Sequence, residues 1–457
     1  MTSPETPVET CDRLIVGGPV ITLDGEDRVY SHGAIAITGT TIAAIGEAAE
    51  LEARFSPRET LHAEDCIVLP GLINSHNHTP LTIVRGMIED RNFAPSYTSG
   101  IPAVHSLSFE DTLALARLGC YEMLRSGSTT VVDYFRCPKA LAIAASEMGV
   151  RAVIGGRIHD ADTEALAQGR YEHRPEIGNA TLKETLDLIE DPLLKGNDRI
   201  RVDFAPHAAD TCSKALLTEV AGLVSRHGGN VHTHLAQSPG EVAYVRERDG
   251  MAPHEVFADA GLLNSRLIAA HCVFLEPEDV AAVGRAGMAV AHAPHQNVMA
   301  GNIAPIRDLE AAGARITLCT DTRSADLFEA MRLAIGSARI RQKGYEPKAP
   351  QVLRWATTSA AAALGLDGIT GSLEVGKRAD LILLDRRQPN LVPLIDGCGI
   401  VVYSGHAANV RTVIVDGRVL LDDGRPTLFD GREVARQAQA VAARLWGECG
   451  LAPLIAD

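Results

Sequence analysis

The hydrophobic pattern changes twice along the chain. Residues 1–70 and the residues after 370 contain short apolar runs separated by Gly and Asp, as in RLIVGGPVITLDGED, GAIAITGTTIAAIG and GSLEVGKRADLILLD. This pattern of short apolar runs and turn residues is typical of antiparallel strands joined by turns. Between these ends, short apolar runs alternate with longer stretches rich in Ala, Leu and Glu, which predicts alternating strands and helices.

The central region contains eight such strand–helix units. The predicted strands cover residues 71–78, 128–135, 150–160, 199–208, 229–237, 267–274, 288–295 and 315–322. Eight units predict an α/β fold in which residues 70–370 form a (β/α)8 TIM barrel. Residues 1–69 and 371–457 are expected to pair into a small β-sandwich, followed by a terminal helix. A doubly wound open sheet is the alternative, but no G-x-G-x-x-G follows the first βα strand.

Charge and cysteine usage narrow the functional class. The formal net charge is −15 and the sequence has no basic run, so a nucleic-acid partner is not expected. No apolar run is long enough for a membrane span, and the first residues do not have the pattern of a signal peptide. The 9 cysteines include no C-x-x-C pair, which favours reduced thiols in the cytoplasm. We therefore expect a cytoplasmic enzyme, in a homo-oligomer, acting on a small-molecule substrate.

Polar residues gather at the ends of the predicted strands, where barrel enzymes carry their chemistry. These residues are His76, His78, His207, His232, His234, His271, His292, His295 and Asp321. Because side chains alternate along a strand, His76 and His78 project from one face, with Cα atoms about 6–7 Å apart. The pair alone fits a turn as well as a metal site. A second H-x-H at His232 and His234, together with Asp321, favours a hydrolytic metal site with an open position for water.

The motifs GLINSHNH, APHAADTCS, HTHLAQ, AAHCVF, AHAPHQNVMAG and CTDT, in this order, resemble the amidohydrolase superfamily. The match is to its branch of cytosine deaminase, S-adenosylhomocysteine/methylthioadenosine deaminases and triazine hydrolases, and it covers nearly the whole chain. The resemblance implies metal ligands at His76, His78, His234 and Asp321.

The same resemblance assigns roles to the remaining strand-end residues. Asp321 would also be the general base, His271 a companion histidine or a further ligand, and His207 a substrate contact. His232 would be structural and His292 supporting. Two-metal relatives use a carboxylated lysine, and no predicted strand here ends in Lys. One divalent ion is therefore expected, with Zn favoured and Fe, Co or Mn also compatible with these ligands.

Two departures from the family pattern bear on the substrate. The deaminases carry a glutamate where HTHLAQ places Gln237, and an amide cannot shuttle a proton, so Gln237 can only position the substrate by hydrogen bonding. Glu241 is an alternative proton donor. The loop NFAPSYTSGIP looks closer to phenylurea and thiocarbamate hydrolases, with Phe93 and Tyr97 as candidate pocket residues.

These departures predict hydrolysis of a small amide, urea or carbamate. Deamination or dechlorination of an N-heterocycle (an aminopurine, aminopyrimidine or s-triazine) is the alternative. A non-catalytic scaffold barrel is disfavoured, because every expected ligand is present.

Overall fold

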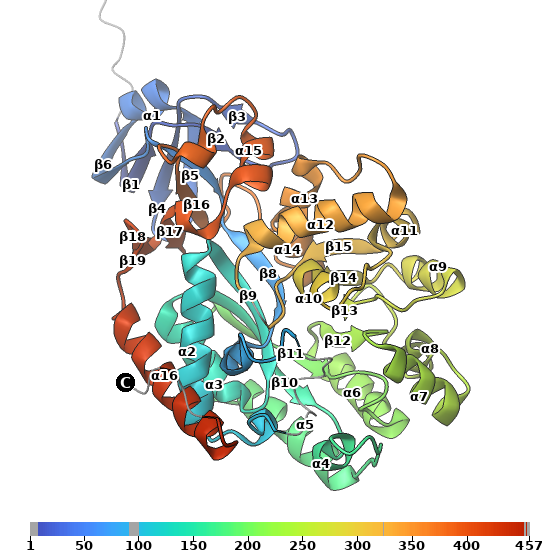
Figure 1. Cartoon of the computed structure of the whole chain (residues 1–457). Helices are drawn as coiled ribbons and strands as arrows, with labels where there is room; N and C mark the ends of the chain where they lie inside the picture. The colour runs from blue at the N-terminus through green and yellow to red at the C-terminus, as the bar shows by residue number, and fades with distance from the viewer. Residues whose placement is uncertain (1–7, 91–99, 323, 452–453, 455–457) are drawn as a thin grey trace, which may run out of the picture.

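Eight parallel strands form the central sheet of the computed structural model, which describes residues 8–90, 100–322, 324–451 and 454 (Figure 1). Each strand pairs with the next one along the chain. In order they are β8 (Leu72–Asn77), β9 (Ser128–Phe135), β10 (Arg151–Ile158), β11 (Ile200–Pro206), β12 (Val231–Leu235), β13 (Leu267–His271), β14 (Ala289–His292) and β15 (Arg315–Leu318). The two ends of the sheet meet where Asn77 forms a parallel bridge with Asp321. The sheet is thus a nearly closed barrel, as predicted, and the open-sheet alternative is wrong.

Burial explains why these segments form strands. Every residue of β9 and β10 is buried, as expected for parallel strands covered by helices on the outside and by side chains within. The covering helices are amphipathic. In α6 (Lys214–His227), Leu216, Val220 and Leu223 recur at helical spacing on the buried face, and the Ser213 side chain caps the first turn.

The remaining helices surround the barrel or extend its loops. They are α2 (Phe109–Arg125), α3 (Pro138–Met148), α4 (Thr163–Leu166), α5 (Pro175–Ile189), α7 (Pro239–Asp249), α8 (Pro253–Asp259), α9 (Pro277–Arg285), α10 (Pro294–Met299), α11 (Ile306–Ala311), α12 (Leu327–Gln342), α13 (Ala349–Trp355) and α14 (Thr358–Leu364). No helix in these described ranges is long and apolar enough to cross a membrane.

Strands from both ends of the chain build two further sheets beside the barrel, in blue and red at the top of Figure 1. One has the order β5 (Thr41–Glu47), β4 (Gly33–Thr38), β1 (Glu9–Val16) and β6 (Phe55–His62). The other has the order β19 (Arg425–Pro426), β18 (Arg418–Asp422), β17 (Val410–Val415), β16 (Leu381–Asp385), β7 (Cys66–Pro70), β2 (Val20–Ile21) and β3 (Val29–Tyr30). The antiparallel pairing of β7 with β16 joins residues more than 300 positions apart.

Two contacts fix the barrel against these sheets. Gly71 connects β7 to β8, and a Cβ atom there would lie 2.0 Å from Thr129 Oγ1, so only glycine fits. The second contact is an ion-pair cluster, in which the buried Arg151 of β10 pairs with Asp380, just before β16, at 2.9 Å and with Asp416, just after β17, at 2.5 Å. Helix α1 (Ala48–Arg54) packs on the first of these sheets, and helix α15 (Gly397–Ser404) packs against α12 and α13. Helix α16 (Gly431–Glu448) returns along α2 (Figure 1).

Candidate metal-binding active site

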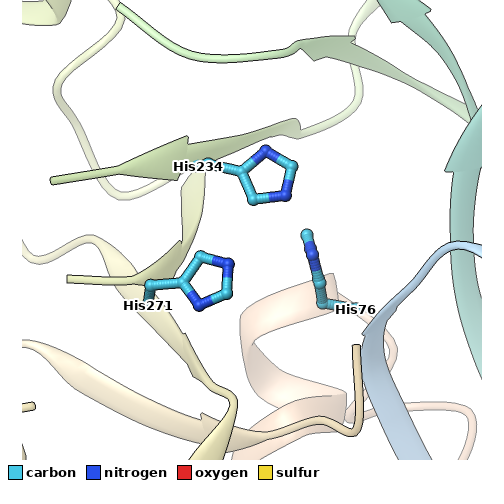
Figure 2. A group of neighbouring side chains, drawn as sticks. All are labelled: His76, His234 and His271. Carbon is cyan, nitrogen blue, oxygen red and sulfur yellow. The ribbon is translucent and has the colours of Figure 1, made fainter. Parts of the chain in front are cut away.

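Histidine side chains from separate strands converge at the carboxyl end of the barrel. Figure 2 shows the rings of His76, His234 and His271 pointing toward a common centre. The ligand atoms of these three lie within 4.8 Å of one another, and the same holds for His76, His78 and Asp321. His76 belongs to both groups, so all five side chains that the sequence placed at or near a metal lie together.

Hydrogen bonds to backbone fix which ring nitrogens face this centre. His78 Nδ1 lies 2.7 Å from the Tyr134 carbonyl, and His234 Nδ1 lies 2.9 Å from the His207 carbonyl. A carbonyl accepts only, so each Nδ1 carries the proton and each Nε2 keeps its lone pair. The two Nε2 atoms are 3.2 Å apart. Two lone pairs facing one another at this distance repel unless a cation lies between them.

Burial keeps these histidines neutral. It lowers the pKa of His78 to about 3, with the charge of Arg157 adding to the effect. Burial also holds the pKa values of His76 and His234 well below the ordinary value. Neutral imidazole is the form that binds metal, because protonation would occupy the ligand lone pair.

Asp321 and His271 complete the cluster. The carboxylate lies 3.8 Å from Nε2 of both His76 and His78, and 3.6 Å from Nε2 of His271. Both residues have left-handed backbone conformations, with φ of 61° for Asp321 and 72° for His271. Such conformations cost about 1–3 kcal/mol in non-glycine residues and are concentrated at functional sites, where the surrounding structure enforces them.

The donor set fits one divalent cation. His76 Nε2 is buried and has no hydrogen-bond partner among the described residues. Imidazole nitrogens with one carboxylate oxygen are the ligands that zinc prefers in catalytic sites. The ligand atoms lie within 4.8 Å of one another in each group, which leaves room for an ion between them. These residues would supply the ligands that the sequence predicted.

A cavity of about 420 Å³ opens onto the cluster. Its described wall presents both polar and apolar surface and comprises His78, Leu81, Arg157, Leu166, Gly169, Tyr171, His207, Asp210, His234, Gln237, Ser238, His271, Val273, Gln296, Asn297, Ala300, Asn302, Asp321 and Thr322. His207 is held on both ring nitrogens, since Arg157 Nη2 lies 2.6 Å from its Nε2 and its Nδ1 lies 2.6 Å from Thr211 Oγ1. His207 and Gln237, the predicted substrate contacts, both line this cavity.

Other candidates lie away from the cluster or outside the described residues. His232 turns away and bonds Asp203 at 3.0 Å, which agrees with a structural role. His295 contacts Glu329 at 3.1 Å, and His292 is buried without lining the described cavity. Phe93 and Tyr97 lie outside the described residues.

Glu241 does not reach the cavity. Its carboxylate accepts the backbone N–H groups of Ala236 at 3.1 Å and Gln237 at 2.7 Å, and the side chain is fully buried. These bonds hold the loop that carries Gln237, and they leave Glu241 poorly placed as a direct proton donor.

Sequence reasoning missed the residues that orient the histidines. Asn297 Oδ1 accepts the Nδ1–H of His271 at 3.0 Å, which leaves His271 Nε2 facing Asp321. Asn297 lies in the recognised motif AHAPHQNVMAG, but no spacing rule marked it. The hydrogen bond between Arg157 and His207 joins neighbouring strands, and only the fold reveals it.

Comparisons with known proteins agree with this geometry. The model of the amidohydrolase family matches residues 67–420. A 5-methylthioadenosine/S-adenosylhomocysteine deaminase from Syntrophobacter fumaroxidans is 36% identical over 94% of this chain and 98% of its own length. A 5'-deoxyadenosine deaminase from Methanosarcina barkeri is 32% identical over 95% and 98%. The crystal structure of a zinc-bound adenosine deaminase from Xanthomonas campestris has a TM-score of 0.85 at 27% identity, covering 96% of this chain and 99% of that one.

These matches support the superfamily and the deaminase branch that the motifs indicated. They do not support the expected closeness to phenylurea or thiocarbamate hydrolases. That expectation rested on a loop of a few residues, whereas the similarity to the deaminases extends over nearly the whole chain.

Proposed function

The chain belongs to the amidohydrolase family and is a hydrolase of carbon–nitrogen bonds other than peptide bonds, and we propose that it deaminates an adenine nucleoside carrying a modified 5' group. Full-length similarity to deaminases of such nucleosides supports this proposal over hydrolysis of a urea or carbamate. The observation that carries it in the structure is the set of polar side chains in the cavity wall, among them His207, Asp210 and Gln237. A nucleoside offers ring nitrogens and hydroxyls to such side chains.

We assign the ligands of one divalent ion, zinc by preference, to His76, His78, His234 and Asp321. When bound, such an ion supplies Lewis-acid activation of water. Asp321 takes the proton from the attacking water and later delivers it to the departing amine. His271, oriented by Asn297 with its Nε2 toward Asp321, accepts a hydrogen bond from the attacking water and orients it.

The other cavity residues position the nucleoside. Gln237 hydrogen-bonds the purine ring, and His207 contacts the substrate while Arg157 holds its ring in place. Arg157 also places a fixed positive charge beside the cavity, which favours electron-rich substrate atoms.

A substrate panel tests this function. The protein is stripped with a chelator, reloaded with zinc, and offered 5'-methylthioadenosine, S-adenosylhomocysteine, 5'-deoxyadenosine, adenosine, a phenylurea and a carbamate, and ammonia release is measured. We expect turnover of at least one adenine nucleoside, lost on stripping and restored on reloading. Turnover of the phenylurea or carbamate with no ammonia from any nucleoside would overturn the proposal.

A further inference from the structure

A carboxyl group lies in the cavity wall close to the position where the family's glutamate is replaced. Asp210 lines the same cavity as Gln237, His234 and Asp321, and its side chain is 8% exposed. Asp210 lies in the stretch APHAADT, where the amidohydrolase pattern that this chain resembles has a tyrosine instead. The chain therefore lacks an acid at position 237 and has gained one at position 210 in the same cavity.

The contacts of Asp210 leave one oxygen available. Tyr171, in the segment between α4 and α5, donates its hydroxyl to Asp210 Oδ2 at 3.1 Å. Asp210 Oδ1 is buried and has no hydrogen-bond partner among the described residues. An unpartnered buried carboxyl oxygen is costly unless it carries a proton or meets a ligand.

Burial favours the protonated form of Asp210, although the positive charges of Arg248 and Arg157 lower its pKa. The two arginines nearby direct hydrogen bonds elsewhere, Arg157 to His207 Nε2 at 2.6 Å and Arg248 to the Ala209 carbonyl at 2.8 Å. Glu241, on α7, is a second buried carboxyl group. Burial raises the pKa of Asp210, and burial together with the charge of Asp210 raises the pKa of Glu241. Two carboxyl groups that interact in a buried region retain a shared proton to higher pH than either would alone.

We infer that Asp210 replaces the missing glutamate as the proton shuttle of the deamination, with Gln237 positioning the ring beside it. This inference rests on the proposed deaminase function.

The step is balanced as follows. The water oxygen bonds to the purine carbon that carries the amine while Asp321 takes one water proton. The carbon–nitrogen π pair moves to the ring nitrogen, which takes its proton from Asp210. The carbon–amine bond then breaks with its electron pair on the amine, which takes the proton from Asp321 and leaves as ammonia. The second proton of the water returns to Asp210 as the carbonyl forms.

Exchange of the two positions tests the inference. Asp210→Asn removes the acid while keeping the shape, and we expect kcat to fall about 100- to 10,000-fold, the range for a general acid. KM and inhibition by the deaminated product should change little. Asp210→Asn/Gln237→Glu returns a carboxyl group to the family's position, and kcat should recover at least tenfold over the single variant. Asp160→Asn is the matched control, because Asp160 is a buried carboxylate on the same side of the barrel that does not line the described cavity.

The pH profile separates a shuttle from a structural role. Wild-type kcat should decline on the alkaline side as the Asp210–Glu241 pair loses its proton, and Asp210→Asn should lack this decline. If Asp210→Asn does not fold, as judged by melting temperature and metal content, Asp210→Ser is measured by the same criteria.

The inference is overturned if a folded Asp210 variant keeps kcat within threefold of the wild type, or if Gln237→Glu gives no recovery in the double variant. In both cases the wild type still deaminates, so the proposed function stands. If the wild type releases no ammonia from any nucleoside, the proposed function fails and the inference fails with it.

Discussion

Removal of the Asn297 side chain tests how the site orients its unusual strand-end histidine. Asn297 is 5% exposed, and its Oδ1 accepts the Nδ1–H of His271 at 3.0 Å. Asn297→Ala leaves that N–H buried without an acceptor, which costs about 1–3 kcal/mol. At about 1.4 kcal/mol per tenfold change, this corresponds to a loss of about 5- to 150-fold in kcat/KM if His271 acts in the transition state.

The assay is steady-state ammonia release with metal content measured on the same samples. Asn297→Asp keeps an acceptor for the Nδ1–H, so its loss should be smaller than that of the alanine variant. Asn264→Ala is the control, because Asn264 lies at the opposite end of β13 and its side chain, among the described residues, bonds only backbone groups of Gly261 and Arg266. A fall in metal affinity of about 10- to 100-fold would identify His271 as a ligand, while unchanged metal with lower kcat would assign it to orienting the attacking water. Activity of Asn297→Ala within twofold of the wild type, or an equal loss in the Asn264 control, would refute the reasoning.

Three further perturbations address the metal site, the buried histidines and the sheet contact. Asp321→Asn removes the proposed base, and ammonia release should fall about 100- to 10,000-fold; retention of most activity would remove Asp321 from that role. Burial lowers the pKa of His292 to about 3, below the unfolded value of about 6.5. The unfolded state therefore binds this proton first, and the stability contributed by neutral His292 is fully present above pH 6.5 and is lost as the pH falls. When metal-free protein is unfolded in urea at a series of pH values, the free energy of unfolding of His292→Gln should fall less steeply toward acid pH than that of the wild type. Equal slopes in the two proteins would contradict this prediction. Arg151→Met leaves Asp380 buried with no other ion-pair partner among the described residues, and it leaves Asp416 only its longer contacts with Arg378 and Arg199. The free energy of unfolding should therefore drop by about 3–5 kcal/mol, against less than about 1 kcal/mol for the part-exposed Arg117→Met.

The sequence predicted the fold because strand–helix alternation is a local signal repeated eight times, and the barrel geometry follows from that count. It also brought His76, His78, His234 and Asp321 together, since residues at the same end of parallel strands must be neighbours. Chain order and the two-residue period of a strand predicted a cluster of strand-end histidines with Asp321. The choice of these four residues as ligands came from the resemblance to the amidohydrolase superfamily.

What the sequence could not provide are contacts between loops. Gln237 was interpreted position by position, and its loss of acid function pointed to urea or carbamate hydrolysis. The fold places Asp210, from the preceding βα loop, in the same cavity wall as Gln237. The site therefore contains a carboxyl group although position 237 does not. Asn297 escaped notice for the same reason, because its partner His271 is 26 residues away in the chain.

Product analysis in water labelled with oxygen-18 tests the central claim most directly. Zinc-loaded protein is incubated with 5'-methylthioadenosine, or with the nucleoside that the panel shows to be turned over, and the products are analysed by mass spectrometry. We predict one labelled oxygen on the purine carbon that carried the amine for each ammonia released, with the sugar and its 5' group intact. Fully metal-loaded, folded protein that leaves every adenine nucleoside unlabelled and intact, while cleaving a phenylurea or carbamate, would contradict the account.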